Sequence, residues 1–182
     1  PFVLPDWWAA LPADRPVVYA NLGSSGGLDG LSAALRALAP CRWTVVAATA
    51  GGRLETPLPP DAAAQVHLAA YLPGDHATAR ADLVICNGGS MTCQQALLAG
   101  RPVLGIAGNM DQFMNMSAVV AAGAGICLRA DRLDAGRLRA ACDALLGDPA
   151  YRSAARALGA RLHPWDAGAR LADLLPTLTA PR

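Results

Sequence analysis

Residues 85–112 read ICNGGSMTCQQALLAGRPVLGIAGNMDQ, and their pattern indicates the class of the fold. It completes an apolar run over 82–86, continues through a segment of helical period over 90–99, and enters a second apolar run over 102–106. A strand, a helix and another strand in this order are typical of a parallel sheet covered by helices. Each apolar run ends in a polar break, at the edge of the sheet where ligands gather in such folds.

The same alternation extends over most of the chain. The other expected strands are 17–22, 44–48, 66–70 and 125–128. The expected helices are 29–38, 75–80, 90–99, 112–122, 134–145, 149–162 and 166–175. The strands are continuously apolar, as expected when helices cover both faces of a sheet. We therefore predict an α/β fold with a Rossmann-like, doubly wound parallel sheet.

The two ends of the chain differ from this middle. Residues 1–16 hold four prolines and two adjacent tryptophans without a regular period, so we expect a linker packed on a surface. Residues 17–165 form the expected Rossmann-like domain, and 166–182 a C-terminal helix and tail. The chain begins with Pro1 rather than methionine, which suggests a fragment or a processed protein.

Composition excludes several classes of function. The 182 residues are 53% hydrophobic, enough for the core of one domain, and their formal net charge is +1. A chain with such balanced charge lacks the excess of positive charge that is typical of proteins that bind nucleic acid or an anionic membrane. No apolar run approaches the ~18 residues of a membrane span. All fifteen basic residues are arginines, which excludes a phosphate-binding, Schiff-base or general-base lysine.

The cysteines and histidines give no pattern of a metal site. The five cysteines are odd in number and form no Cys-x-x-Cys pair, so we expect free buried thiols in a reducing, cytoplasmic compartment. His67, His76 and His163 lie far apart, without partners at metal-ligand spacing. No Ser-His-Asp order and no Gly-x-Ser-x-Gly elbow is present.

The loop Asn87-Gly88-Gly89-Ser90 leads from a strand into a helix. Such a loop aims unpaired N–H groups and the positive end of the helix dipole at one point, which favours an anion such as phosphate. Ser90 and Thr92 can add hydroxyl donors, and Gln95, about one turn further on, could reach a sugar hydroxyl. The alternative is a plain Gly-Gly turn with Ser90 as the N-cap of the helix.

Three other loops are open to two interpretations each. Gly23-Ser24 follows the first strand and could approach a phosphate or form a plain turn. Tyr71, after the third strand, could stack on a flat base or cover the edge of the core. Asp111-Gln112 could bind sugar hydroxyls, although Asp111 alone is more simply read as an N-cap.

Taken together, these motifs resemble the carboxyl-terminal, donor-binding half of the two-domain (GT-B) glycosyltransferases that use nucleoside-diphosphate sugars. The resemblance covers nearly the whole chain, in the order of the family's motifs. Residues 71–73 stand where the family usually has Trp-x-Pro, and 87–92 where it has a His-Cys/Gly-Gly motif. Residues 100–102, 111–115 and 122–125 are similar to its Gly-x-Pro, Asp-Gln-x-x-Asn and Ala-Gly-x-Gly motifs.

The resemblance implies a role for each loop. The base would stack on Tyr71 and hydrogen-bond the backbone of Leu72, and Gln95 would bind the ribose. Asp111 with Gln112 would bind the transferred sugar. The diphosphate would lie among the residues of the two glycine-containing loops and the helix that follows the second, which are Gly23, Ser24, Asn87, Gly88, Gly89, Ser90 and Thr92.

Three positions depart from the family pattern. Asn87 replaces a histidine, Gln95 replaces a glutamate, and Tyr71 replaces a tryptophan. The site would therefore hold its donor with neutral amides, backbone dipoles and a smaller stacking surface. The resemblance also implies that neither a metal nor another cofactor is needed, because helix N-terminal dipoles and side chains stabilise the leaving diphosphate.

The expected function is donor binding in an inverting, metal-independent glycosyltransferase that moves a sugar from a UDP- or TDP-sugar to a hydroxyl of a small molecule or lipid. The resemblance places the general base in an N-terminal acceptor domain, so no catalytic residue is expected in this chain. The fragment should bind the donor without turnover. Its apolar surface toward the missing domain could promote self-association.

Three alternatives remain open. One is a standalone donor-binding subunit that acts with a separate membrane partner. Another is a sugar-nucleotide epimerase of the same fold, for which Asp111 is the only acid/base candidate. The third is a flavodoxin-like binding domain.

Overall fold

The computed structural model describes residues 2–23, 27–54, 57–59, 62, 65–162 and 167–179. Six parallel strands form one sheet in the order β3-β2-β1-β4-β5-β6. The strands are β1 (Val17–Asn21), β2 (Thr44–Ala48), β3 (Val66–Ala69), β4 (Leu83–Cys86), β5 (Val103–Ala107) and β6 (Gly125–Arg129). The strand order reverses between β1 and β4, as in doubly wound folds. The predicted fold class is therefore confirmed.

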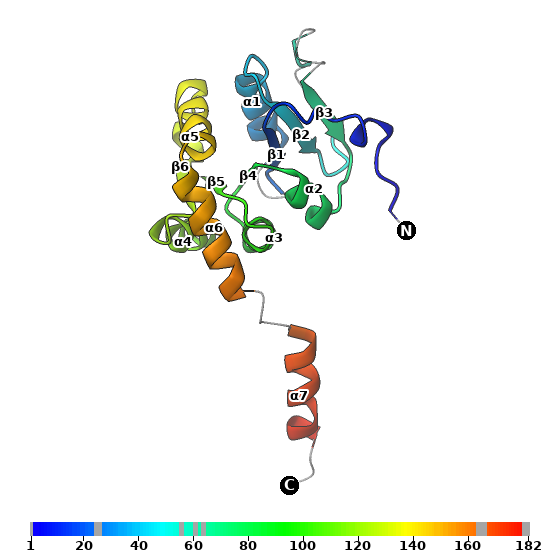
Figure 1. Ribbon diagram of the computed structural model, residues 1–182, viewed down its shortest axis with the longest axis vertical. Helices are drawn as coiled ribbons and strands as arrows, with labels where there is room; N and C mark the ends of the chain where they lie inside the picture. Colours follow the sequence, from blue (N-terminus) through cyan, green and yellow to red (C-terminus); the bar gives the residue numbers. More distant parts are fainter. Residues whose placement is uncertain are drawn as a thin grey trace.

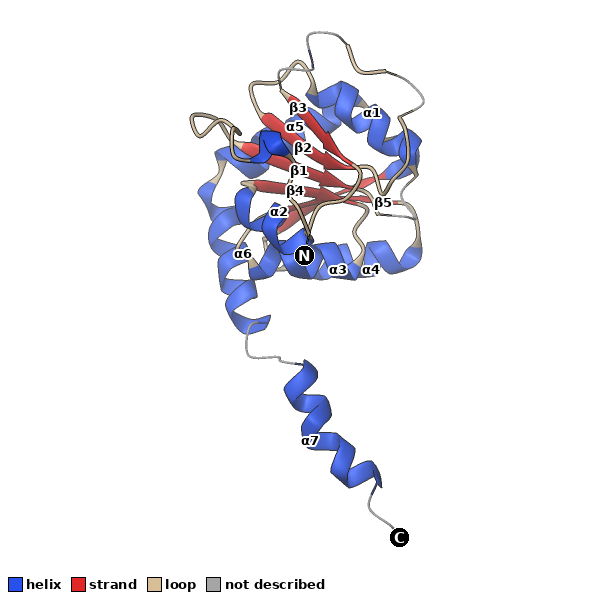
Figure 2. Cartoon of the chain, turned by 90° about the vertical axis from the view of Figure 1, so that its right-hand side faces the viewer, coloured by secondary structure: helices blue, strands red, loops and turns tan. Residues whose placement is uncertain are grey.

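Helices cover both faces of the sheet (Figure 1, Figure 2). One face packs against α1 (Leu28–Leu38) and α5 (Ala135–Gly147), and the other against α2 (Gly74–Arg80), α3 (Ser90–Leu98) and α4 (Met110–Ala121). Helix α6 (Pro149–Leu162) packs on α3. A Cβ atom on Gly159 of α6 would overlap the carbonyl oxygen of Leu97, so the two helices approach closely at this glycine.

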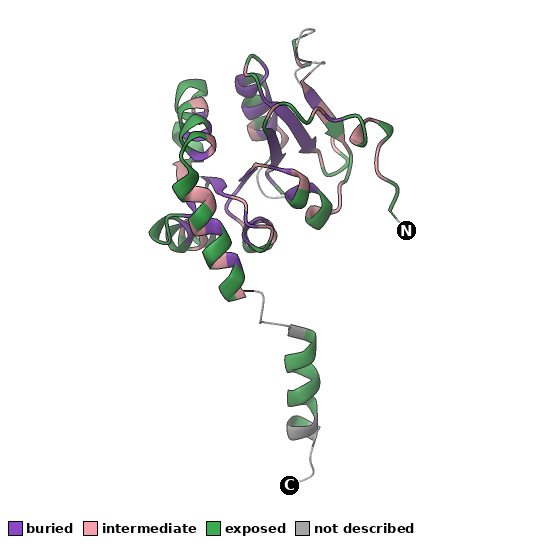
Figure 3. Ribbon diagram, in the orientation of Figure 1, coloured by how far each residue is buried: buried purple, intermediate pink, exposed green. Residues whose placement is uncertain are grey.

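Both faces of strand β4 are covered, which explains why its sequence is continuously apolar. Leu83 and Ile85 point into the core beneath α1 and α5, whereas Val84 and Cys86 point into the core on the opposite face. All four side chains are fully buried, and the central strands are mostly buried in Figure 3. Because side chains alternate along a strand, two covered faces require an apolar residue at every position.

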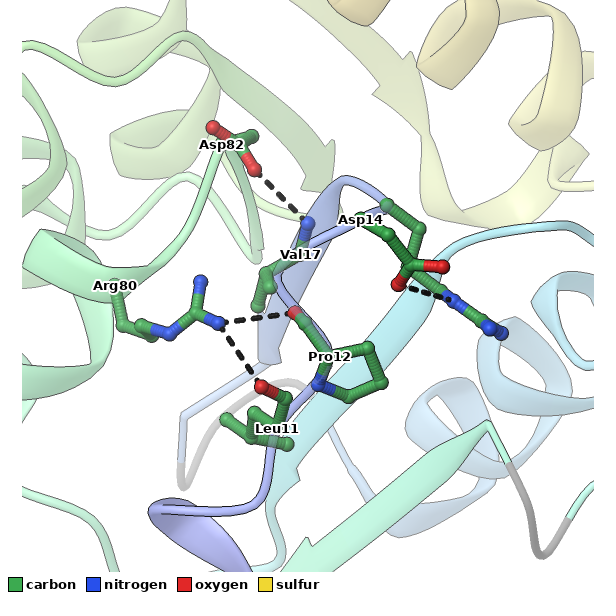
Figure 4. A network of polar contacts seen from close by, with 7 residues as sticks. Leu11, Pro12, Asp14, Val17, Arg80 and Asp82 are labelled. Atoms are coloured by element: carbon green, nitrogen blue, oxygen red, sulfur yellow. Dashed lines mark hydrogen bonds and ion pairs between the residues drawn. The ribbon is translucent and has the colours of Figure 1, made fainter.

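Residues 2–16, the predicted linker, lie on the domain and contain a short 3-10 helix η1 (Asp6–Trp8) that the sequence did not predict. The ring of Trp7 lies 5.1 Å from that of His67 on the edge strand β3. Arg80 donates to the carbonyl oxygens of Leu11 at 3.4 Å and Pro12 at 3.0 Å (Figure 4). These contacts hold the linker against β3 and α2.

Asp82 connects the amino ends of two neighbouring strands. Its Oδ2 accepts a hydrogen bond from the backbone N–H of Val17, 3.0 Å away at the start of β1 (Figure 4). Its Oδ1 accepts from Arg152 of α6 at 2.7 Å and lies 3.9 Å from Arg101. One carboxylate thus ties β1, the start of β4 and α6 together at the amino edge of the sheet.

The C-terminal helix α7 (Ala167–Thr179) lies apart from the sheet and its helices in Figures 1 and 2. It extends beyond the predicted end at residue 175, because the leucine spacing of Leu171, Leu174 and Leu175 continues at Leu178 and Pro176 does not stop the helix. The predicted break at 163–165 lies outside the described residues. In the described part of the chain, no helix is long and apolar enough to cross a membrane.

Candidate functional site

The loops after β1 and β4 meet where the strand order reverses. Gly23 has φ of +64°, and its N–H donates to Oδ1 of Asn21 at 2.9 Å. A Cβ atom on Gly23 would lie only 3.3 Å from Nδ2 of Asn87. The structure therefore brings together Gly23 and Asn87, which are 64 positions apart in the sequence (87 − 23). Ser24, which was also predicted for this site, lies outside the described residues.

Asn87 is 7% exposed and shapes the loop that contains it. Its Oδ1 accepts a hydrogen bond from the N–H of Gly89 at 2.9 Å. Because the oxygen is turned toward its own loop, the Nδ2 donor end is turned toward Gly23. This orientation presents N–H groups rather than a carbonyl oxygen where the two loops meet.

Gly88 could not be replaced by another residue without strain. Its φ is +83°, and a Cβ atom there would lie 2.9 Å from Cγ of Met116 and 3.1 Å from the carbonyl oxygen of Gln112. The loop after β4 is thus pressed against α4, in a conformation that favours glycine. The sequence did not single out Met116, because nothing in the local pattern shows this contact.

The interpretation of Ser90 as N-cap is wrong. Helix α3 begins at Ser90, and its N-cap is Gly89, which has no side chain to accept a hydrogen bond from the first turn. Ser90 is exposed and Thr92 is half-buried, both in that turn. A helix N-terminus without a capping side chain offers its N–H groups and its positive dipole end to a ligand.

The interpretation of Asp111 as N-cap is also wrong. The N-cap of α4 is Asn109, whose Oδ1 accepts from the backbone N–H of Gln112 at 3.1 Å. An asparagine directly before a helix is a recognisable N-cap signal, although we had predicted Asp111 instead. Asp111 is exposed in the first turn of α4.

Gln112 is 5% exposed, and its Oε1 accepts from the N–H of Gly108 at 2.8 Å. The side chain therefore holds the loop after β5 from within. This supporting role could not be predicted from the sequence. Gln112 lines a cavity of about 110 Å³ together with residues of α1 and β5 and of the segments that follow β1, β5 and β6.

Tyr71, after β3, is 62% exposed, and its hydroxyl donates to the carbonyl oxygen of Ala50 at 3.1 Å. Ala50 has φ of +52°, and a Cβ atom on the next residue, Gly51, would lie 2.9 Å from the Tyr71 hydroxyl. Tyr71 thus supports the loop after β2 and leaves much of its ring to solvent. Leu72 is half-buried and packs against the core.

Gln95 lies over the beginning of α2. A Cβ atom on Gly74 would overlap the side-chain amide of Gln95, so the absence of a side chain at Gly74 makes room for it. Since Gly74 follows Tyr71 by three positions, the loop after β3 and helix α3 lie close together. This is the relation expected if the two residues bind parts of one nucleoside.

Two edges of the sheet could be considered as the site. The amino edge carries an open cavity of about 410 Å³ whose lining includes Asp82, Gly147, Asp148 and Arg152. There the charged groups of Asp82 and Arg152 already pair with each other. The carboxyl edge carries a recess of about 240 Å³ between the loops after β1 and β2, beside Gly23. Among the residues that the structure describes, the carboxyl edge alone combines N–H donors, an uncapped helix and an exposed aromatic ring.

Within the described residues, no group of three or more His, Cys, Asp or Glu side chains is arranged to hold a metal ion. The donors that the site offers are amides, hydroxyls and backbone N–H groups. These groups suit an anionic ligand with sugar hydroxyls.

The chain is similar in sequence and in fold to several known proteins. Residues 44–164 match the family described as "Erythromycin biosynthesis protein CIII-like, C-terminal domain". A PGL/p-HBAD biosynthesis rhamnosyltransferase of Mycobacterium bovis (strain BCG / Pasteur 1173P2) is 51% identical over 154 residues, which are 85% of this chain and 33% of that protein. The 4'-demethylrebeccamycin synthase of Lentzea aerocolonigenes is 32% identical over 97% of this chain and 42% of its own length. The chain thus spans a third to two fifths of these relatives.

Solved structures of glycosyltransferases share the fold. SnogD from Streptomyces nogalater has a TM-score of 0.78 at 28% identity, over 99% of this chain and 48% of that chain. The spinosyn rhamnosyltransferase SpnG complexed with thymidine diphosphate has a TM-score of 0.73 at 26% identity, over 90% of this chain and 45% of that chain.

Proposed function

The chain belongs to the family of EryCIII-like C-terminal domains of GT-B glycosyltransferases, and we propose that its cluster of loops binds the nucleoside-diphosphate sugar from which such an enzyme transfers a sugar. The observation that carries this proposal is the meeting of Gly23, Asn87 and the uncapped start of α3 at the reversal in strand order. The thymidine diphosphate complex of a protein with the same fold supports it.

Each loop has a proposed part in donor binding. Tyr71 stacks on the base, whose edge hydrogen-bonds to the backbone of Leu72, and Gln95 binds the ribose. Asp111 binds the transferred sugar, and Gln112 supports that loop while its amide contributes to the same contact. The diphosphate is held by residues at the start of α3 and in the loops before it, which are Gly23, Ser24, Asn87, Gly88, Gly89, Ser90 and Thr92.

The chemistry of the site favours stabilisation of a leaving diphosphate. An acceptor hydroxyl attacks the anomeric carbon from the side opposite the leaving diphosphate. The configuration at that carbon inverts, and negative charge develops on the diphosphate. Preorganised N–H donors and a helix dipole stabilise such a charge without reorganising. We propose that this chain needs no metal for the task, and that the general base for the acceptor hydroxyl comes from the part of the enzyme that its relatives have in addition.

We propose that the acceptor is a hydroxyl of a small molecule or lipid, as the names of the relatives suggest. We also propose a cytoplasmic location, because all five cysteines are free. The share of each relative that the chain spans favours a donor-binding half over a standalone subunit.

Titration calorimetry of the chain with nucleoside diphosphates tests the proposal. We expect saturable binding of thymidine or uridine diphosphate in the micromolar to millimolar range, with the same affinity in the presence of EDTA. Adenosine diphosphate, with its larger base, serves as the comparison. No heat with any of the three diphosphates at millimolar concentration would show that the loops are not a donor site.

A further inference from the structure

Three sulfur-bearing side chains lie directly beneath the loop 87–90. Cys86 is the last residue of β4, Cys93 lies in the first turn of α3, and Met116 belongs to α4. The Sγ atoms of Cys86 and Cys93 are 3.7 Å apart, and Sγ of Cys93 lies 3.8 Å from Sδ of Met116. Cys86 is completely buried and Cys93 is 4% exposed.

The loop rests on these sulfur atoms. The N–H of Gly88 donates to Sγ of Cys86 at 3.3 Å, and Met116 occupies the space where a side chain at Gly88 would be. Cys86 directly precedes the segment 87–92 and Cys93 directly follows it. This segment contains most of the residues that we propose as diphosphate ligands. Any movement of their sulfur atoms is therefore transmitted to that segment.

We propose that Cys86 and Cys93 form a reversible disulfide and that this modification weakens donor binding. The inference rests on the proposed donor site for its effect, but not for its chemistry. A covalent S–S bond is about 2 Å long, so the sulfur atoms must approach each other by about 1.7 Å. Cys86 then no longer accepts from Gly88 in its present position, and the first turn of α3 is pulled toward β4.

The two thiols differ in pKa, and this difference indicates which of them reacts first in the oxidation. The hydrogen bond with Cys86 lowers the pKa of Cys93, and the position in the first turn of a helix acts in the same direction. The same hydrogen bond, together with burial, raises the pKa of Cys86. Cys93 is therefore the thiol that reacts first with an oxidant, and Cys86 is the resolving thiol.

The oxidant is a peroxide, whose small size suits a buried pair. The Cys93 thiolate attacks one peroxide oxygen, the O–O bond breaks, and Cys93 becomes a sulfenic acid while an alcohol or water leaves. The Cys86 sulfur then attacks Sγ of Cys93, the S–O bond breaks, and water leaves. The two thiols lose two protons and two electrons in total, and the peroxide is reduced by two electrons.

The experiment treats the chain with hydrogen peroxide and measures the linkage and the donor affinity separately. Trypsin leaves residues 81–129 in one peptide, since the chain has no lysine and Arg101 precedes Pro102. In a Cys127→Ala background this peptide contains only the two thiols of interest. We expect it to lose the mass of two hydrogen atoms and to regain them with dithiothreitol.

The affinity for thymidine diphosphate is expected to fall roughly tenfold on oxidation and to recover on reduction, because the loop loses a positioning hydrogen bond. Cys93→Ala should bind like the reduced chain and be insensitive to peroxide. Cys41→Ala, a change of a cysteine in the other core layer, should leave the sensitivity intact.

Three results would overturn the inference: no linkage between Cys86 and Cys93, a linkage with unchanged affinity, or equal sensitivity in Cys93→Ala. A reduced chain that binds no diphosphate would instead contradict the proposed donor site and, with it, the effect on binding. The peptide mass would still decide whether the disulfide forms.

Discussion

Asn87→Asp is expected to lower the affinity for thymidine diphosphate about a hundredfold or more. The change keeps the size of the side chain and its hydrogen bond from Gly89, but it replaces the Nδ2 donor near Gly23 by a carboxylate oxygen. A carboxylate about 5 Å from a phosphate costs roughly 3 kcal/mol at the effective dielectric constant of a protein surface, which is about a hundredfold in affinity. Calorimetry with thymidine diphosphate measures the effect.

The fold should tolerate this substitution. A negative charge beside the start of α3 is favourable for the helix, so the free energy of unfolding should change by less than about 1 kcal/mol. Asn109→Asp is the matched control, because Asn109 likewise precedes a helix and accepts from its first turn. We expect the control to keep its affinity for thymidine diphosphate within about threefold. Equal losses in both variants would mean that Asn87 has no specific contact with the diphosphate.

Asp82→Asn is expected to destabilise the fold by about 2 kcal/mol while leaving donor affinity unchanged. The amide can still accept from Val17, but it loses its charge interactions with Arg152 and Arg101 and turns an N–H group toward their donors. The Asp82 side chain is 33% exposed, so the cost lies between that of breaking an exposed pair, about 0–1 kcal/mol, and that of breaking a buried one, about 3–5 kcal/mol. Urea unfolding measures the difference.

Asp131→Asn is the control for this experiment. Asp131 pairs with Arg129 at 2.8 Å, but both side chains are more than half exposed, so the same substitution should cost little. A similar loss in the two variants would show that the network around Asp82 contributes no more than an exposed ion pair. A lower donor affinity of Asp82→Asn would contradict the placement of the site at the opposite edge of the sheet.

The sheet could be predicted from the sequence because its strands are buried on both faces. In β4 and β5 every residue is buried, so the apolar runs over 82–86 and 102–106 coincide with the strands almost residue for residue. The reversal between β1 and β4 did not follow from any one run. It depends on pairing between segments that are far apart in the sequence, such as Val18 with Leu83.

The capping of the helices was predicted less well than their existence. Ser90 and Asp111 are residues of the type that caps helices, yet the caps are Gly89 and Asn109. A helix start that moves by one or two residues changes the role of each neighbouring side chain, and local propensity does not fix it to that precision. At Gly89 the consequence is functional, because the first turn of α3 remains uncapped by a side chain.

The supporting contacts of the site could not have been predicted, since they join segments distant in the chain. The Tyr71 hydroxyl reaches Ala50, Gln95 lies over Gly74, and Met116 fills the space beside Gly88. The contact between Asn21 and Gly23 is different: an asparagine two residues before a glycine after a strand is a recognisable turn signal.

The most direct test of the donor site is an NMR titration of the isotope-labelled chain with thymidine diphosphate. It shows which backbone amide signals shift when the ligand is added. We predict that the largest shifts belong to Gly23, Leu72, Gly88, Gly89 and Ser90, from three loops that meet only in the folded structure. The signals of Gly147 and Asp148, which line the cavity at the amino edge, should not move. Shifts centred on that cavity, or spread evenly over the domain, would contradict a donor site at the carboxyl edge of the sheet.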